Sequence, residues 1–400
     1  MTTATGTKGP TLTRIALSAL LLAAGVAPLP HGWASARVAR DNARSTELNR
    51  ADRKRDAGGY YEGLIGGDGS PGARDELALT LMGKPANWTR FGDAGVSRQM
   101  PADYLQFELI PNVNRTLFGR RFTTNGAGLR DLPTTEAKPD GIIRVALLGS
   151  SMDMGWGVGD DQTYENLFEN WLNAHAARRG LPRRFEVLNF AVAAYSPAQR
   201  LESYRRKAAA FKPDLVFYSV TMLDPRLTEI HLRSLLLNRV PLRDDFLVRA
   251  LASTGLTEAD FRLDARGKLV DKSSVKDKIR DQCWPIADGA LGALAAECRA
   301  ADIPLACLII PRVGKSDEPG TRDEAVARHS GIAAHHAVPV IDLSASFDRH
   351  DPRELEIASW DDHPNAAGHR RLFLGLARAV AAQPELYRSL FDASPPPPRP

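Results

Sequence analysis

Three side chains that together can perform acyl transfer are spread over this sequence. Ser151 follows an apolar run that ends at Gly149, and Asp361 and His363 lie two residues apart far downstream. A serine hydroxyl is a weak nucleophile until a base accepts its proton and a third group orients that base. The three residues would supply the nucleophile, the base and the orienting acid if the fold brings them into contact.

The elements that must position these residues follow from the apolar pattern after residue 142. Short apolar runs alternate with amphipathic segments, which favours a parallel sheet with right-handed helical crossovers. Ligands of such sheets bind at the carboxyl ends of the strands, where Ser151 falls. Asp361 and His363 precede the final predicted helix. The predicted strands are 142–149, 185–192, 214–222, 304–311 and 338–344, and the predicted helices are 161–179, 197–211, 284–301, 321–336 and 364–382.

The segment around the serine resembles the first motif of the SGNH family, which contains esterases, lipases and acyltransferases. The family has Gly-Asp-Ser-x-x-x-Gly at this place. This chain has Gly149-Ser150-Ser151 followed by Gly155, so that Ser150 replaces the usual Asp. An Asn-x-x-Gly-x-Arg-Asp element at 125–131, similar to one in exported relatives, precedes the motif.

The segment around the histidine resembles the family's last motif, Asp-x-His before a proline and a helix. Asp361-Asp362-His363-Pro364 fits this form, because Trp360 stands where the longer form has its acid. The resemblance implies Ser151 as nucleophile, His363 as base and Asp361 as orienting acid, with Asp362 as the competitor for the last role. It extends over roughly residues 120 to 385 and implies a flavodoxin-like, three-layer α/β/α SGNH hydrolase fold with a parallel sheet.

The two middle motifs of the family are less complete. Ala194 stands where the family has a glycine whose backbone N–H binds the oxyanion, and Leu223 stands where it has an oxyanion-binding Asn. A backbone donor survives a change from Gly to Ala if the dihedral angles suit Ala. The resemblance therefore implies backbone donors at Ser151 and Ala194, and Thr221 is the candidate to replace the lost side chain. Loss of one such donor costs about 10²–10³ in turnover.

Composition excludes several other classes of function. Hydrophobic residues make up 43% and charged residues 25% of the 400 residues, as in ordinary globular proteins. The net charge of +4 comes without a concentrated basic patch, so no nucleic-acid partner is predicted. No nucleotide-binding glycine loop and no His-Glu-x-x-His motif occurs, so neither a cofactor nor a metal is expected. Cys298 and Cys307 are expected to be buried apolar residues.

The two ends of the chain differ from the core in composition. Basic residues precede the apolar run 15–29, and Ala34-Ser35-Ala36 follows, which is the layout of a signal peptide. We therefore expect an exported protein, with membrane contact only if this segment remains as an anchor. The predicted divisions are a signal peptide or anchor at 1–36, an N-terminal extension at 37–140, the hydrolase-like domain at 141–390 with a helical insertion at about 224–283, and a disordered Pro-rich tail at 391–400.

These observations predict a serine-dependent ester hydrolase. Short acyl groups, such as acetyl esters on carbohydrate, suit both the export signal and the family. Two alternatives stay open: an O-acyltransferase that modifies an exported polysaccharide, and a non-catalytic carbohydrate-binding protein on the same fold. The last is motivated by Ala194 and Leu223, and the presence of Ser151, His363 and Asp361 argues against it.

Overall fold

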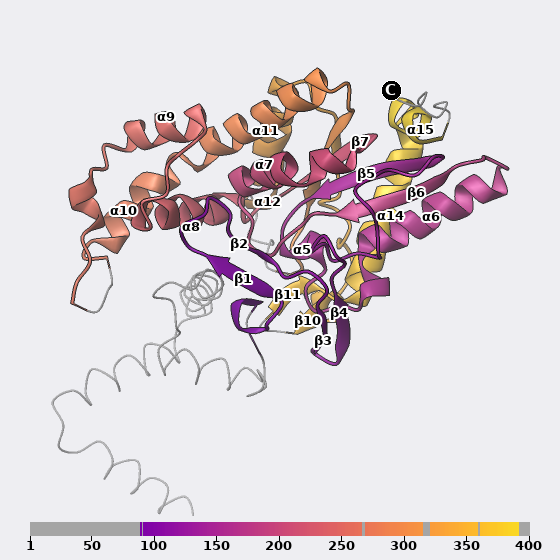
Figure 1. Ribbon diagram of the computed structural model, residues 1–400, viewed down its shortest axis with the longest axis horizontal. Helices are drawn as coiled ribbons and strands as arrows, with labels where there is room; N and C mark the ends of the chain where they lie inside the picture. The colour runs from indigo at the N-terminus through magenta and orange to yellow at the C-terminus, as the bar shows by residue number, and fades with distance from the viewer. Residues whose placement is uncertain (1–88, 90, 266–268, 315–320, 359–360, 392–400) are drawn as a thin grey trace, which may run out of the picture. The chain divides into compact units, whose positions relative to one another are not determined.

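A five-stranded parallel sheet forms the centre of the fold (Figure 1). The computed structural model describes residues 89, 91–265, 269–314, 321–358 and 361–391. The strand order is β6-β5-β7-β8-β9, the order of flavodoxin-like folds, which confirms the predicted fold class. The strands are β5 (Ile142–Leu148), β6 (Arg184–Asn189), β7 (Leu215–Thr221), β8 (Leu305–Ile310) and β9 (Val340–Asp342).

Strand β5 lies between β6 and β7, and this position places Ser151, which follows β5, between the ends of two neighbouring strands. Ala146 is level with Leu188 of β6 and with Val216 of β7. The carboxyl ends of all three strands therefore meet at one edge of the sheet, and Ser151 begins the helix that follows β5. The predicted strand 185–192 is too long at its end, because the Asn189 side chain accepts the Ala191 N–H and turns the chain there.

Helices cover both faces of the sheet, because alternate residues of each buried strand point to opposite faces. On β5, Ile143, Val145 and Leu147 join one apolar cluster, whereas Ala146 and Leu148 join another. The first cluster includes α6 (Tyr164–Arg178), α14 (Ala366–Ala382) and α15 (Pro384–Phe391). The second includes α7 (Pro197–Arg206), α8 (Asp224–Leu237), α11 (Cys283–Ala300) and α12 (Thr321–His335). The three predicted layers are thus present.

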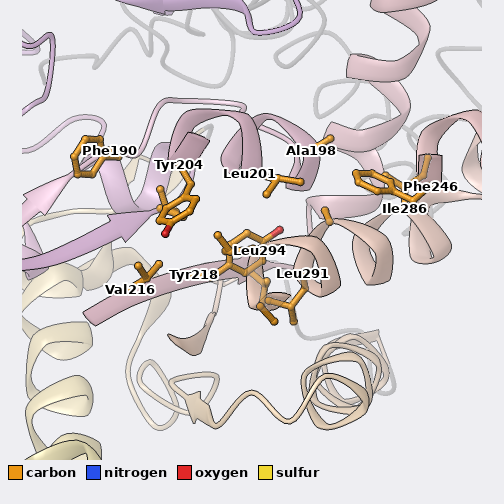
Figure 2. Close-up of a cluster of buried hydrophobic side chains, with 14 of the residues drawn as sticks. Phe190, Ala198, Leu201, Tyr204, Val216, Tyr218, Phe246, Ile286, Leu291 and Leu294 are labelled. Carbon is orange, nitrogen blue, oxygen red and sulfur yellow. The ribbon is translucent and has the colours of Figure 1, made fainter. Parts of the chain in front are cut away.

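Figure 2 shows part of the second cluster, in which side chains of α7 and α11 meet near strand β7. Leu201 of α7 and Leu294 of α11 lie near Tyr218 of β7 in this view. Burial of such side chains supplies most of the driving force for folding. All three cysteines are buried and free, and burial was expected for Cys298 of α11 and Cys307 of β8. Burial raises the pKa of the Cys307 thiol to about 12, so this sulfur stays protonated.

Two antiparallel hairpins precede the sheet in the sequence. The residue pattern also predicts short strands at 107–112 and 121–125, and these are present as β2 (Gln106–Leu109) and β4 (Arg120–Thr123). Each has a partner that the sequence pattern missed. Both partners are polar and lack alternating apolar residues, so nothing local marks them as strands. The four strands are β1 (Ser97–Met100), β2 (Gln106–Leu109), β3 (Asn114–Leu117) and β4 (Arg120–Thr123).

The insertion after β7 is helical, as predicted, and consists of α8, α9 (Asp245–Thr254) and α10 (Lys272–Arg280). These helices pack with one another and against α11 (Figure 1). That these helices cover the active site remains a prediction, as do the domain boundaries. The final predicted helix is not the last one, since α15 follows α14.

Several predictions fall outside the described residues, namely the signal peptide, the linker after it, Trp360 and the Pro-rich tail. Within the described ranges, every helix is too short or too polar to cross a membrane.

Candidate active site

The structure brings Ser151, His363 and Asp361 into one hydrogen-bonded chain. His363 Nε2 lies 2.7 Å from Ser151 Oγ, and His363 Nδ1 lies 2.5 Å from Asp361 Oδ1. A carboxylate only accepts hydrogen bonds, so Nδ1 carries the proton and Nε2 is free to accept the serine proton. All three side chains are buried. This arrangement has the order and contacts of a nucleophile, a base and an orienting acid.

The contacts of Asp361 and Asp362 show which of these neighbouring acids hydrogen-bonds to the imidazole. Asp361 also accepts the backbone N–H of His363 at 3.2 Å, whereas the carboxylate of Asp362 pairs with Arg312. Successive residues of strand β11 (Asp361–Pro364) alternate between its two sides, so Asp361 and His363 share a side. Arg312, which follows β8, is thus the ion-pair partner of Asp362.

Strand β11 is held in place by Asn365, which follows it. The Asn365 side chain accepts the N–H groups of Ala367 and Gly368 and so caps α14. Its amide group donates to the carbonyls of Glu354 and Glu356. The Asn after His-Pro therefore fixes both the start of the helix and the strand that carries the histidine.

A tight turn presents the serine at the end of β5. Ser150 donates its backbone N–H to the Asp153 carboxylate at 2.8 Å, and the Tyr164 hydroxyl donates to the same carboxylate at 2.7 Å. A Cβ on Gly149 would lie 2.2 Å from Asp153 Oδ2, so only glycine fits before this turn. Gly155 ends the short helix α5 (Ser151–Met154) at φ +79°, a left-handed conformation.

Asp153 is a buried acid that the family motif does not contain. Burial raises the pKa of its carboxyl, although the Ser150 N–H and the Tyr164 hydroxyl act in the opposite direction. Ser150 occupies the place of the motif's usual Asp and offers no carboxylate there. We infer that Asp153 supplies the acceptor that orders this turn, three residues downstream of the usual position.

Arg130 fastens the other side of the nucleophile turn. Its guanidinium donates to the backbone carbonyls of Met154, Gly155 and Val158, and it is buried. These carbonyls lie at and after the end of α5, where helical partners run out. The element at 125–131, which resembles one in exported relatives, therefore helps to position the serine.

Asp131 and Asn189 connect the loop after β6 to the turn after β5. Asp131 accepts the N–H of Asn189 at 3.0 Å, and the Asn189 side chain donates to the carbonyl of Asp153 at 2.9 Å. Asn189 thus holds neighbouring loops together through contacts with backbone groups. The loop after β6 is tied by these bonds to the turn that carries Ser151.

Two backbone N–H groups are available to bind an oxyanion. Ser151 is the first residue of α5, so its N–H has no acceptor within the helix. Neither this N–H nor that of Ala194 has a hydrogen-bond acceptor among the residues that the structure describes. Ala194 has φ +64°, the left-handed conformation that favours glycine, which fits its place at the family's glycine position. The donor role of both groups remains a prediction.

Replacing Ala194 by Gly should raise the free energy of unfolding by about 1 kcal/mol, because glycine adopts the left-handed conformation without strain. Ala193→Gly is the matched control, since the neighbouring alanine is not in that conformation and should lose stability. Urea unfolding of both variants measures the difference. A destabilised Ala194→Gly protein would contradict the strain at this position.

Thr221 is the last residue of β7, and Leu223 lies in the turn that follows, where the family has its Asn. The Thr221 hydroxyl accepts the Leu223 N–H at 3.0 Å, and the Thr221 carbonyl accepts from His329 at 3.1 Å. The hydroxyl is therefore engaged within its own loop. Its predicted role toward an oxyanion remains a prediction, and Leu223 is a buried apolar side chain that cannot donate.

A buried ion pair that the sequence did not reveal anchors the same loop. Arg200 of α7 binds Asp224 of α8 through two hydrogen bonds of 2.8 and 2.6 Å, and both side chains are fully buried. Burial by itself lowers the pKa of Arg200, but the Asp224 carboxylate raises it above the ordinary value. The two residues are 24 positions apart, and no local pattern pairs them.

A second serine–histidine contact lies at the start of α7 and is structural. The Ser196 hydroxyl lies 2.9 Å from His231 Nδ1, and His231 Nε2 lies 2.8 Å from the carbonyl of Tyr104. Nε2 must donate to that carbonyl, so Nδ1 accepts from the hydroxyl. No carboxylate orients this imidazole among the described residues, and burial lowers the pKa of His231 to about 4.

His231 should make the protein less stable in mild acid. The unfolded imidazole has a pKa of about 6.5, higher than the folded value, so the unfolded state binds more protons as the pH falls from about 6.5 toward 4. Stability should fall by about 2 kcal/mol between pH 7 and pH 5 from this residue alone. His231→Gln keeps one donor and one acceptor and should flatten that slope in urea unfolding. An unchanged slope would contradict a neutral buried His231.

Sequence reasoning found the three candidate residues but missed their support. Asp153 and the Arg200–Asp224 pair carry no motif of their own, and Arg130 stands in an element whose role the sequence does not show. The only signal available was the Arg-Asp in the element at 125–131. His369 is buried and accepts the Tyr164 N–H at 3.1 Å, which is a structural role.

Several solved structures are similar to this chain. An acetylxylan esterase from Geobacillus stearothermophilus shares 15% identity over 60% of this chain and 94% of its own, with a TM-score of 0.39. A two-domain esterase active on acetylated mannans shares 15% identity over 65% of this chain and 52% of its own, with a TM-score of 0.36. An esterase from Pseudoalteromonas shares 11% identity over 60% of this chain and 97% of its own, with a TM-score of 0.36.

One protein family matches a range of this chain that contains both the serine motif and the histidine motif. No curated relative matches the sequence. The model of the GDSL-like Lipase/Acylhydrolase family matches residues 147–371, more than half of the chain, and this range includes Ser151, Asp361 and His363. The chain therefore belongs to the GDSL-like lipase and acylhydrolase family and is a carboxylic ester hydrolase.

Proposed function

We propose that this protein is an exported serine esterase that removes short acyl groups, acetyl groups above all, from carbohydrate. The observation that carries the proposal is the chain of contacts from Asp361 through His363 to Ser151. The substrate class rests on the family resemblance and on the N-terminal segment at 1–36, whose composition is that of an export signal.

The reaction begins when Ser151 Oγ attacks the acyl carbonyl and His363 Nε2 takes the hydroxyl proton. Asp361 holds the imidazole in the required tautomer and stabilises the imidazolium that forms. His363 then returns the proton to the leaving alcohol, which departs and leaves the acyl group on Ser151. Water, deprotonated by His363, cleaves this ester and restores the serine.

The oxyanion of each tetrahedral intermediate would bind the N–H groups of Ser151 and Ala194. The positive end of the α5 peptide dipoles adds to this stabilisation. Leu223 provides no third donor, so we expect turnover about 10²–10³ below that of an enzyme with the complete set.

The proposal is tested with purified full-length protein on p-nitrophenyl esters of increasing acyl length and on acetylated polysaccharides. The highest kcat/KM should belong to the acetyl ester, and acetate release should be lost in Ser151→Ala. Hydrolysis that persists in Ser151→Ala would overturn the proposed nucleophile. A folded wild-type protein without hydrolysis would favour a binding role, which Leu223 motivates.

An acyltransferase would use the same acyl-enzyme, with a sugar hydroxyl in place of water. The two reactions differ only in the acceptor that reaches the acyl group. Product analysis with added oligosaccharide distinguishes them, since a transferase yields acylated sugar at the expense of free acid. We expect free acid to dominate. Periplasmic or extracellular recovery of the expressed protein tests the proposed export.

A further inference from the structure

A cluster of metal-ligating side chains lies outside the active site, between α11 and α12. Asp288 Oδ1 lies 2.9 Å from His335 Nδ1 and 3.1 Å from His336 Nε2. One ligating atom from each of these side chains lies within 4.8 Å of the other two. One carboxylate and two imidazoles thus converge on a single point, from two helices that pack against each other.

This set of donors matches what zinc and similar ions prefer. Zinc binds imidazole nitrogen at about 2.0–2.1 Å and carboxylate oxygen at about 2.0–2.2 Å, with tetrahedral geometry. Two ligand atoms of such a site are therefore roughly 3.3 Å apart. The separations from Asp288 are close to this value, so small shifts of the side chains would admit an ion. Three protein ligands leave one position for water.

The ends of the helices favour a cation at this point. Helix α12 ends at His335, and the carbonyl end of a helix carries the negative end of its dipole. Arg299 donates to the carbonyl of His336 at 3.1 Å, which ties this helix end to α11. The Asp288 carboxylate and the carboxyl end of α12 both carry negative charge, so both attract a cation to this point.

The position of His336 is built into α11. A Cβ on Gly292 would lie 2.5 Å from His336 Cε1, so the glycine leaves the space that this imidazole fills. His336 is mostly buried, whereas the His335 side chain is 68% exposed. One ligand is therefore fixed by packing, and the other can turn toward an arriving ion from solvent.

We propose that Asp288, His335 and His336 bind one divalent transition-metal ion of the zinc class, which links α11 to α12. Neither histidine contacts the catalytic residues, so the ion would stabilise the fold rather than take part in ester hydrolysis. Sequence analysis predicted no metal, because Asp288 lies 47 residues before His335 and only the fold unites them.

The test is titration of the purified full-length protein with Zn²⁺ alone, by calorimetry, and with Co²⁺, by visible absorption. Wild-type protein should bind one equivalent of Zn²⁺ with Kd below about 10 µM, and Co²⁺ should give the absorption bands of tetrahedral coordination. A hundredfold excess of Zn²⁺ over Kd should raise Tm by roughly 5 °C.

His335→Ala and Asp288→Asn should each weaken Zn²⁺ binding at least about tenfold and abolish the rise in Tm. His335 is exposed, so its loss should leave the fold intact. His350→Ala is the matched control, a histidine outside the cluster, and should bind as the wild type does. The proposal is overturned if His335→Ala binds Zn²⁺ with wild-type affinity, or if wild-type Kd exceeds about 100 µM.

Discussion

Replacing Asp361 by Asn should lower kcat for ester hydrolysis by about 10³–10⁴, whereas Asp362→Asn should keep kcat within roughly tenfold of wild type. The two acids are neighbours with the same chemistry, but it is Asp361 that accepts the hydrogen bond from His363 Nδ1. An Asn there can present its amide group to the imidazole and favour the wrong tautomer. Asp362 pairs with Arg312 instead.

Steady-state kinetics of the two variants on p-nitrophenyl acetate measure the difference. Both substitutions remove one charge and almost no volume, so each is the control for the other. KM should change little in Asp361→Asn, because the carboxylate acts on the base and not on bound substrate. Equal losses in the two variants, or a larger loss in Asp362→Asn, would contradict the assignment of Asp361.

Breaking the Arg200–Asp224 pair should destabilise the protein by about 3–5 kcal/mol. Both side chains are fully buried, so removal of one partner leaves the other charge without compensation. Arg200 also donates to the carbonyl of Ser219, and Asp224 accepts the N–H of Thr221. The pair therefore fixes the end of β7 and the loop that carries Leu223.

A double-mutant cycle separates the pair from simple packing. Arg200→Met and Asp224→Leu should each cost about 3–5 kcal/mol in urea unfolding, and the double variant should cost less than their sum by at least about 2 kcal/mol. The apolar replacements restore volume without leaving a lone charge. Additive effects, or single losses below about 1 kcal/mol, would contradict a buried and mutually dependent pair.

The sheet was predictable because its strands are buried on both faces. Strands β5 and β7 are nearly continuous apolar runs, a pattern typical of parallel sheets. Polar β1 and β3 form only because a hairpin partner lies beside them, so no local pattern identifies them. The end of β6 at Asn189 was also missed, because the residues after it are still apolar. A hydrogen bond from the Ala191 N–H to the Asn189 side chain turns the backbone there, and the sequence pattern does not show it.

The candidate site was predictable only where residues carry a motif. Ser151, Asp361 and His363 stand in recognisable blocks, but the pairing of Asp362 with Arg312, 50 residues upstream, has no signal in the sequence. Long-range partners such as Arg200 and Asp224 belong to no motif whose spacing would identify them. The left-handed conformation of Ala194 is likewise invisible in the sequence, because an alanine gives no sign of positive φ.

Reaction of the purified full-length protein with a fluorophosphonate probe tests the central claim most directly. The probe phosphonylates only an activated serine, and intact mass and peptide mapping locate the adduct. The account predicts one adduct, on Ser151, in the wild-type protein and none in Ser151→Ala or His363→Ala. A folded wild-type protein that takes no label, or an adduct on a different serine, would contradict it.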